Sequence, residues 1–142
     1  MEHEFLQNMM NQAYDKFDSG FTKAQWMLRL NWDEKIAVVA GNLNYQVGNG
    51  GFVQWADNGY IDTADLLLEI TNEMATETSL EVAALIEQML EIWEEYLEYQ
   101  DDDSWQDMFG QTDSMDTRFY QINDQFLVEI EGYIKLIQEQ VA

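Results

Sequence analysis

The stretch that decides the fold is residues 43–59, which read LNYQVGNGGFVQWADNG. Glycines at positions 48, 50 and 51 surround Asn49 and interrupt an otherwise helical pattern of apolar residues. Glycine and asparagine tolerate positive φ, and glycine also allows two backbones to approach closely. We therefore expect two helices to meet here at a sharp corner, with Phe52 and Trp55 pointing into the core. Asn58 and Gly59 break the pattern a second time.

Outward from this corner, the chain has the features of an all-α protein. It contains no proline, and apolar residues recur at helical spacing almost throughout its 142 residues. This length suits one domain, so residues 1–142 are predicted to form a single compact helical domain of about six helices. Before the corner we expect a helix from about Phe5 that stops near Gly20, a short helix over 22–30 with Trp26, Met27 and Leu30 buried, and a helix capped by Asp33.

After the corner, Asp62 is placed to cap a helix that carries Ala64, Leu67, Leu68 and Ile70. Thr78 and Glu81 have capping-box spacing and predict a long helix to about Gln100. The acidic run 101–103 then predicts an exposed loop to about Met115, pinned to the body by Trp105, Met108 and Phe109. The last helix is expected to begin near Asn123.

Acidic residues dominate the middle of the sequence. Between Lys35 and Arg118 the sequence has 18 Asp and Glu residues and no Lys, Arg or His. Many advance by three or four residues and therefore fall on one helix face, about 5 to 6 Å apart along the axis. Like charges at this spacing destabilise a helix by about 0.2–0.5 kcal/mol per pair unless a basic residue relieves them. The spacing resembles the pitch of phosphates along a nucleic-acid strand.

The net charge limits the kinds of molecule that could bind this protein directly. A net charge of −22 disfavours nucleic acid and anionic membranes as direct partners and favours basic surfaces. At 46% hydrophobic and 13% aromatic residues, the composition is that of a folded protein. The acidic start and the lack of a long apolar run predict a cytoplasmic protein without a signal peptide or membrane span. An acidic composition with few lysines is also found in proteins adapted to high salt. That adaptation predicts acidic residues spread evenly over the whole surface.

The run 43–59 resembles the Asn-Gly-Gly-Phe-x-Gln signature of the DMP-like family of acidic DNA-mimic proteins, here Asn49, Gly50, Gly51, Phe52 and Gln54. The similarity extends over about residues 21–137, including the helix at 64–70, Phe119–Tyr120 and Tyr133–Ile134. It implies an all-helical fold, a possible homodimer and occupation of the DNA-binding surface of another protein. Gly48 departs from the asparagine or acidic residue expected there. We interpret the five motif residues as structural, because glycines and a buried Phe suit a corner.

The sequence offers little for catalysis or cofactors. It has no cysteine and one histidine, His3, and the glycine-rich run has no nearby cation to bind a phosphate. Asp101, Asp103 and Asp107 fail the calcium-loop pattern, because Trp105, Gln106 and Thr112 stand at its diagnostic positions. We therefore predict no enzyme, no catalytic residue, no cofactor and no metal site.

The leading hypothesis is a DNA mimic that binds the basic DNA-contacting surface of a transcription regulator, a nucleoid protein or a defence nuclease, the last as in phage counter-defence or an anti-CRISPR protein. Trp105 and Met108 are candidates for apolar contact at the interface. An immunity or adaptor protein that neutralises a basic toxin, a metal-dependent hydrolase and a plain solvated face remain as alternatives. The carboxylates predicted to stand in for phosphates are Asp62, Asp65, Glu69, Glu73, Glu77, Glu87, Glu91, Glu94, Glu95, Glu98, Asp101, Asp102, Asp103 and Asp107.

Overall fold

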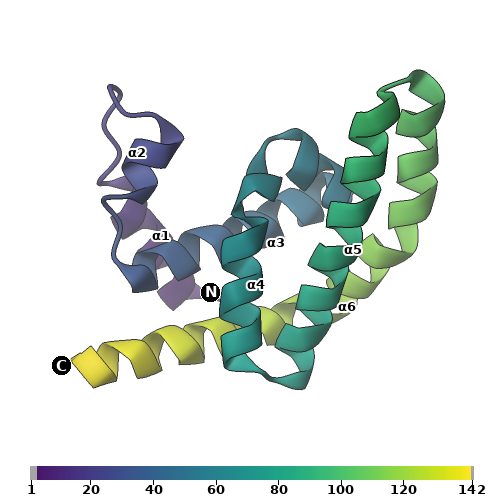
Figure 1. The fold of residues 1–142 in the computed structure, drawn as a ribbon. Coiled ribbons are helices and arrows are strands. Elements are labelled where there is room, and N and C mark those ends of the chain that lie inside the picture. The colour runs from purple at the N-terminus through teal and green to yellow at the C-terminus, as the bar shows by residue number, and fades with distance from the viewer. Residues whose placement is uncertain (1–2, 142) are drawn as a thin grey trace.

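Six α-helices and one short 3₁₀ helix make up the structure, a computed structural model that describes residues 3–141 (Figure 1). The prediction of an all-α fold is confirmed, and residues 3–141 contain no strand. Met1, Glu2 and Ala142 lie outside the described residues. Glu2 is part of the acidic start on which the prediction of no signal peptide depends. The elements are α1 (Glu4–Tyr14), α2 (Lys23–Met27), α3 (Trp32–Asp57), η1 (Tyr60–Thr63), α4 (Ala64–Met74), α5 (Glu77–Tyr99) and α6 (Asp102–Val141).

The predicted corner lies inside α3. The helix continues through Gly48 and Asn49, so the break begins at Gly50 rather than at Gly48. Gly51 has φ 77° and ψ −178°, a conformation open in practice to glycine alone. The carboxylate of Asp116 on α6 accepts a hydrogen bond from the Phe52 N–H at 2.9 Å and so caps the helix where it restarts.

The core closes over this corner. The Phe52 side chain is fully buried and packs edge-on against Trp55 and Phe119, with ring centroids 6.2 and 5.6 Å apart. Phe119 comes from α6, so this contact joins the corner to the last helix. The expectation that Phe52 and Trp55 enter the core is confirmed.

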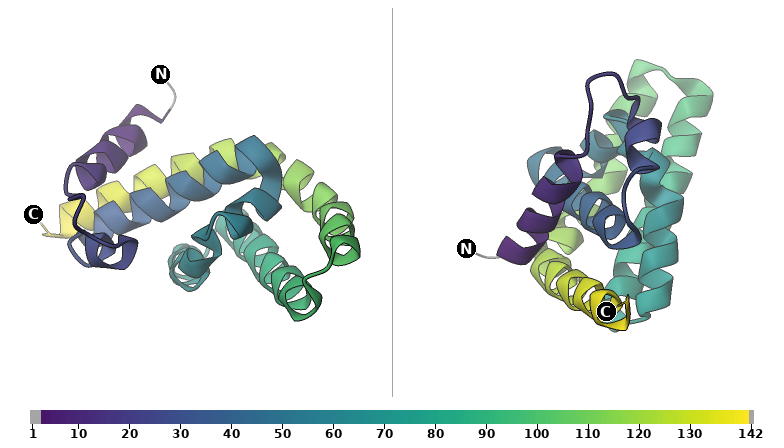
Figure 2. Two further views of the ribbon diagram at one scale, coloured as in Figure 1. Left: turned by 90° about the horizontal axis from the view of Figure 1, so that it is seen from above. Right: turned by 90° about the vertical axis from the view of Figure 1, so that its left-hand side faces the viewer.

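The longest helix, α6, covers 40 residues and packs mainly against α5 and α3, with a smaller contact to α1 (Figures 1 and 2). Its first part pairs with α5, and its second part runs beside α3 in the opposite direction. The Tyr120 hydroxyl donates to the Val47 carbonyl at 2.9 Å, and near the far end the Gln138 amide donates to Asp33 at 3.0 Å. These pairings place the end of α6 beside the start of α3.

The predicted loop over 101–115 and the predicted helix start near Asn123 are both wrong. Met108, Thr112, Met115 and Phe119 are all buried and recur every three or four residues, so this segment forms one buried helical stripe in the part of α6 that pairs with α5 and reaches the corner of α3. The Asp101 side chain accepts a hydrogen bond from the Ser104 N–H at 2.7 Å and caps the helix. The acidic run therefore starts α6 instead of opening a loop.

Helix ends elsewhere also differ from the predictions. Thr76 caps α5 with Ser79 as its capping-box partner, in place of Thr78 and Glu81. Asn31 rather than Asp33 occupies the cap position of α3, with Glu34 completing the box. α1 ends at Tyr14, before Gly20, and Asp62 lies within η1 without capping α4. The predicted short helix shrinks to Lys23–Met27, although Trp26 and Leu30 are buried as expected.

Candidate functional site

All fourteen carboxylates predicted to bind a partner are exposed. They are carried by η1, α4, α5, the α5–α6 turn and the start of α6. α4 and α5 are consecutive helices in contact, and α5 in turn contacts α6, so the carriers are neighbours in space (Figure 1). The predicted residues therefore share one connected group of helices.

The outer surface of α5 carries the most regular array. Its exposed acids alternate along the chain with Ile86, Met89 and Ile92, which are buried. Spacings of three or four residues, about 4.5–6 Å of axial rise, place the acids on one face. We call this set the α5 acidic face; it consists of Glu87, Glu91, Glu94, Glu95 and Glu98.

Basic side chains leave these carboxylates unpaired. Within residues 3–141, the ion pairs of the structure join His3 to Asp124 and Glu131, Lys16 to Glu34, and Arg118 to Glu81. None of the fourteen predicted carboxylates takes part. Arg118 is the basic residue closest to the array in sequence, and its bonds to Glu81 raise the pKa of its guanidinium while lowering that of the Glu81 carboxyl.

Two members of the set have other neighbours. Asp62 lies near Lys23, whose ammonium sits 3.8 Å from the centre of the Tyr60 ring; burial lowers the pKa of Lys23 while Asp62 opposes this. Glu73 faces Tyr133 of α6, where burial first, and then Glu73 and Glu69, raise the pKa of the phenol to about 12. The α5 acidic face has no such neighbour, which makes it the strongest part of the candidate site.

Aromatic side chains support the tip of the α5–α6 hairpin. Trp93, Tyr96, Trp105 and Phe109 form a row with successive ring centroids 5.2, 5.4 and 5.2 Å apart. Trp105 is half-buried in this row. The interface role predicted for Met108 is corrected, because its side chain is 1% exposed and belongs to the core.

Sequence reasoning did not identify Tyr99 and Phe109 as exposed interface candidates at this tip. The side chains of Tyr99 and Phe109 are 60% and 41% exposed and stand close to the acidic residues of the turn. The helical spacing of 105, 108, 112 and 115 was the signal that could have identified this segment as helix, with Phe109 outside the buried stripe. The capping bonds from Ser104 lower the pKa of Asp101 at the same turn, so this carboxylate is ionised.

The five motif residues lie at the corner of α3. Gly51 and Phe52 are buried there, while Asn49 is exposed. The Gln54 amide donates to the Gln46 carboxamide oxygen at 3.1 Å across the kink. These positions agree with a structural interpretation of the motif.

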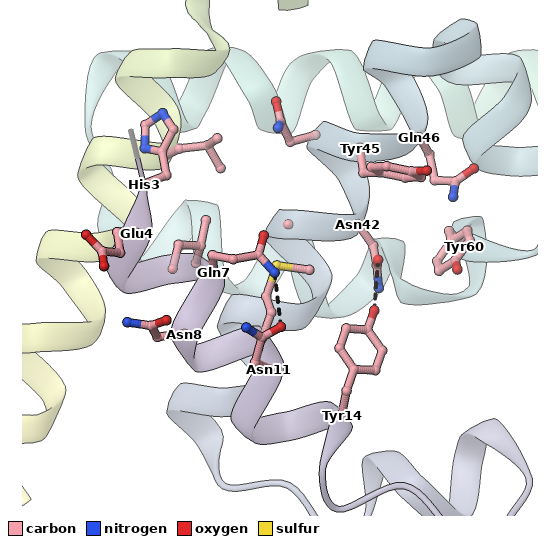
Figure 3. A pocket seen from close by; sticks show the side chains of 15 residues that line it. His3, Glu4, Gln7, Asn8, Asn11, Tyr14, Asn42, Tyr45, Gln46 and Tyr60 are labelled. Atoms are coloured by element: carbon pink, nitrogen blue, oxygen red, sulfur yellow. Dashed lines mark hydrogen bonds between the residues drawn. The ribbon is translucent and has the colours of Figure 1, made fainter. Parts of the chain in front are cut away.

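A groove of about 770 Å³ lies between α1 and α3, where Tyr60 of η1 and Leu127 of α6 complete its wall; none of the fourteen carboxylates lines it (Figure 3). Six carboxamides and three tyrosines line it, against two ionisable side chains that are not tyrosine, His3 and Glu4. Its carboxamides are Gln7, Asn8, Asn11, Asn42, Asn44 and Gln46. A neutral, amide-rich surface is unusual on a chain with a net charge of −22.

Across residues 3–141, no three acidic or histidine side chains gather closely enough to hold a metal ion. Over the same residues, every helix is too short or too polar to cross a bilayer. The expectations of no metal, no cofactor and no catalysis remain predictions.

The fold and the candidate site together define an acidic all-helical domain in which one exposed face of α5 carries unpaired carboxylates. A comparison with protein families matches residues 28–140 to the family described as DMP19-like protein. The match covers most of the chain, so this protein belongs to the DMP19-like protein family. It begins after α2, which leaves α1 and α2 outside the matched region. No curated protein and no solved structure matches the chain.

Proposed function

We propose that this protein is a DNA mimic, which binds the basic DNA-contacting surface of a DNA-binding protein and excludes DNA from it. In this mechanism the α5 acidic face takes the place of a run of phosphates. The acids of α4 and of the α5–α6 turn extend the negative surface on either side. Trp105, with Tyr99 and Phe109, supplies apolar contact at the tip.

The observation that carries the proposal is the persistence of uncompensated charge on α5. The five acids of this face form five like-charge pairs at three- or four-residue spacing: 87/91, 91/94, 91/95, 94/98 and 95/98. At about 0.2–0.5 kcal/mol each, the pairs cost the helix roughly 1–2.5 kcal/mol. A face kept only for solubility would be more stable with interleaved lysines, whereas a basic partner would offset this cost on binding. Membership of the DMP19-like protein family is consistent with this use.

The first experiment removes charge from the face without reversing it. The variant Glu91→Gln/Glu94→Gln/Glu98→Gln deletes three exposed contacts, each worth about 0.2–1 kcal/mol. We expect binding to a partner isolated from lysate to weaken by about 3- to 150-fold, with unchanged helicity by circular dichroism. The matched control neutralises three exposed acids outside the site, as Asp15→Asn/Asp18→Asn/Glu139→Gln. If both variants lost the same affinity for the partner, binding would depend on net charge alone, which would contradict the assignment of the α5 acidic face as the binding site.

The second experiment distinguishes a DNA mimic from an immunity or adaptor protein. The isolated partner is mixed with labelled duplex DNA, and fluorescence anisotropy follows displacement of the DNA as this protein is added. A DNA mimic competes with DNA for the same surface of the partner. The apparent affinity of the partner for this protein should therefore fall as the DNA concentration is raised. A ternary complex, or a partner that does not bind DNA, would refute mimicry while leaving the acidic interface in place.

A further inference from the structure

The groove between α1 and α3 contains two buried carboxamides with unused donors. The side chains of Asn42 and Gln46 are 8% and 7% exposed. Each uses its oxygen within the protein: that of Asn42 accepts from the Tyr14 hydroxyl at 3.2 Å, and that of Gln46 accepts from Gln54 and from Asn58 at 3.1 and 2.8 Å. No acceptor within residues 3–141 pairs with either NH₂ group, and neither nitrogen is sealed from the groove (Figure 3).

The two carboxamides are carried at helix positions whose spacing suits one kind of ligand. Residues 42 and 46 lie one helical turn apart, with about 6 Å of rise between them. An extended polypeptide rises about 3.3–3.4 Å per residue, so carbonyl groups two residues apart on one side of it repeat every 6.7 Å or so. Two carboxamides at this spacing match two alternate carbonyl oxygens of an extended main chain. A neutral NH₂ group pairs well with a peptide carbonyl and does not require a charged ligand.

The remaining walls suit the side chains of such a segment. Leu6, Met10 and Leu127 supply apolar surface, and the Met10 side chain packs directly against Gly41 of the α3 wall. Tyr45, which is 63% exposed, and Tyr60 flank the end near Gln46 (Figure 3). Aromatic faces bind ammonium and guanidinium groups, and the stems of Lys and Arg cover apolar surface. Lys23 already lies over the ring of Tyr60, so the exposed ring of Tyr45 is the aromatic face left for such a group. The net charge of −22 attracts basic segments over acidic ones.

We propose that the α1–α3 groove is a binding site for an extended, lysine- or arginine-rich polypeptide segment, whose main-chain carbonyls accept hydrogen bonds from Asn42 and Gln46. The site lies on elements other than those of the α5 acidic face, and α1 is outside the family match. It therefore stands whether or not the protein mimics DNA. Main-chain hydrogen bonds supply affinity in this mode, and alternate side chains supply specificity.

The test uses an N-acetylated, C-amidated peptide of ten alternating lysine and serine residues, titrated into the ¹⁵N-labelled full chain. The side-chain NH₂ signals of Asn42 and Gln46 are assigned by their disappearance in Asn42→Asp and Gln46→Glu. Saturation with the peptide is expected to shift both signals. Unchanged NH₂ signals, with shifts confined to α4 and α5, would overturn the proposal.

The same two variants separate hydrogen bonding from simple charge attraction. Asp and Glu keep the oxygens that accept from Tyr14, Gln54 and Asn58, lose the donors, and add negative charge. The proposal predicts that each weakens peptide binding by about two- to tenfold, despite the added charge. Binding that is unchanged or tighter would refute it. Where one variant melts too early for titration, the other and the wild-type NH₂ shifts still decide.

A neutral oligosaccharide, chitohexaose, tests the competing chemistry, because amides and tyrosines also bind sugars. No shift at Asn42 or Gln46 is expected with it. Shifts with chitohexaose and none with the peptide would overturn the proposal in favour of a carbohydrate site. Partner binding through the α5 acidic face is measured separately with the Glu91, Glu94 and Glu98 variant, so the failure of one proposal is distinguishable from failure of the other.

Discussion

Replacement of Gly51 by alanine tests the corner on which the whole fold turns. The backbone there has φ 77° and ψ −178°, and a Cβ atom would collide with the carboxylate of Asp116, 2.8 Å from its Cγ. The conformation costs a non-glycine residue about 1–3 kcal/mol. Forcing the extra atom into the packed contact adds about 1–3 kcal/mol. We therefore expect Gly51→Ala to lower the free energy of unfolding by about 2–6 kcal/mol, a large share of the 5–15 kcal/mol typical of a domain.

Guanidinium denaturation followed by circular dichroism at 222 nm measures this change. The matched control is Gly48→Ala, three residues earlier in the same helix, where a Cβ would meet no atom within 4 Å. Alanine there should be neutral or stabilise the helix by up to about 1 kcal/mol. If Gly51→Ala were no more destabilising than Gly48→Ala, the assigned role of the corner would be refuted.

A double-mutant cycle isolates the collision from the backbone strain. Asp116→Ala removes the cap on the Phe52 N–H and should cost about 0.5–2 kcal/mol alone. Combined with Gly51→Ala it also removes the obstructing carboxylate. The double variant should therefore be more stable than the sum of the two single effects, by about 1–3 kcal/mol. If the effects of the two substitutions on the free energy of unfolding were strictly additive, the added Cβ at position 51 would not collide with the Asp116 carboxylate.

Three further predictions concern charge. Burial, opposed by the Phe52 N–H and assisted by Asp113, raises the pKa of Asp116, so its contribution to stability is full below its unfolded pKa of 3.8 and is lost as the pH rises through the raised value. Asp116→Asn keeps an acceptor for the Phe52 N–H but cannot ionise. Denaturation of both proteins across pH 3–7 should show that the variant lacks this loss of stability with rising pH. If the free energies of unfolding of wild type and variant changed with pH in parallel, the prediction would be contradicted. Tyr133, with a pKa raised to about 12, contributes stability that is full below pH 10 and is lost as the pH rises to about 12. The difference in absorbance at 295 nm between wild type and Tyr133→Phe should titrate near pH 12, and titration near 10 would place this phenol in open solvent. Sodium chloride from 0.05 to 1 M should raise Tm by screening the net charge of −22, and a flat calorimetric response would argue against self-repulsion.

Much of the architecture was predictable because local chemistry and packing agree. Apolar periodicity and the absence of proline predicted an all-helical fold, and the glycines predicted the corner at the position where Gly51 needs a positive φ. Carboxylates spaced by three and four residues predicted exposed helix faces, and the structure exposes all fourteen. A helix face can be inferred from spacing alone because every turn repeats it.

The errors arose where two local signals competed. The run Asp101–Asp103 suggested a loop, although carboxylates at a helix start are favoured by the helix dipole. The burial of Met108, Thr112 and Met115 where α6 packs on the body of the protein decided the outcome, and that packing depends on residues far away in the sequence. Cap positions were misplaced by two residues for α3 and α5, because several Ser, Thr, Asn and Asp residues near each start were chemically eligible. The groove was invisible to sequence reasoning, since it needs α1 set against α3 in space.

The single long helix α6 has a consequence for how this chain is made. Because it lines both α5 and α3, the apolar surfaces of those helices stay uncovered until it has emerged from the ribosome. At about 5–20 residues per second, translating its 40 residues takes roughly 2–8 s. During that interval the nascent chain presents unburied side chains around Phe52 and Ile86, and the strong negative charge that surrounds them keeps neighbouring nascent chains apart.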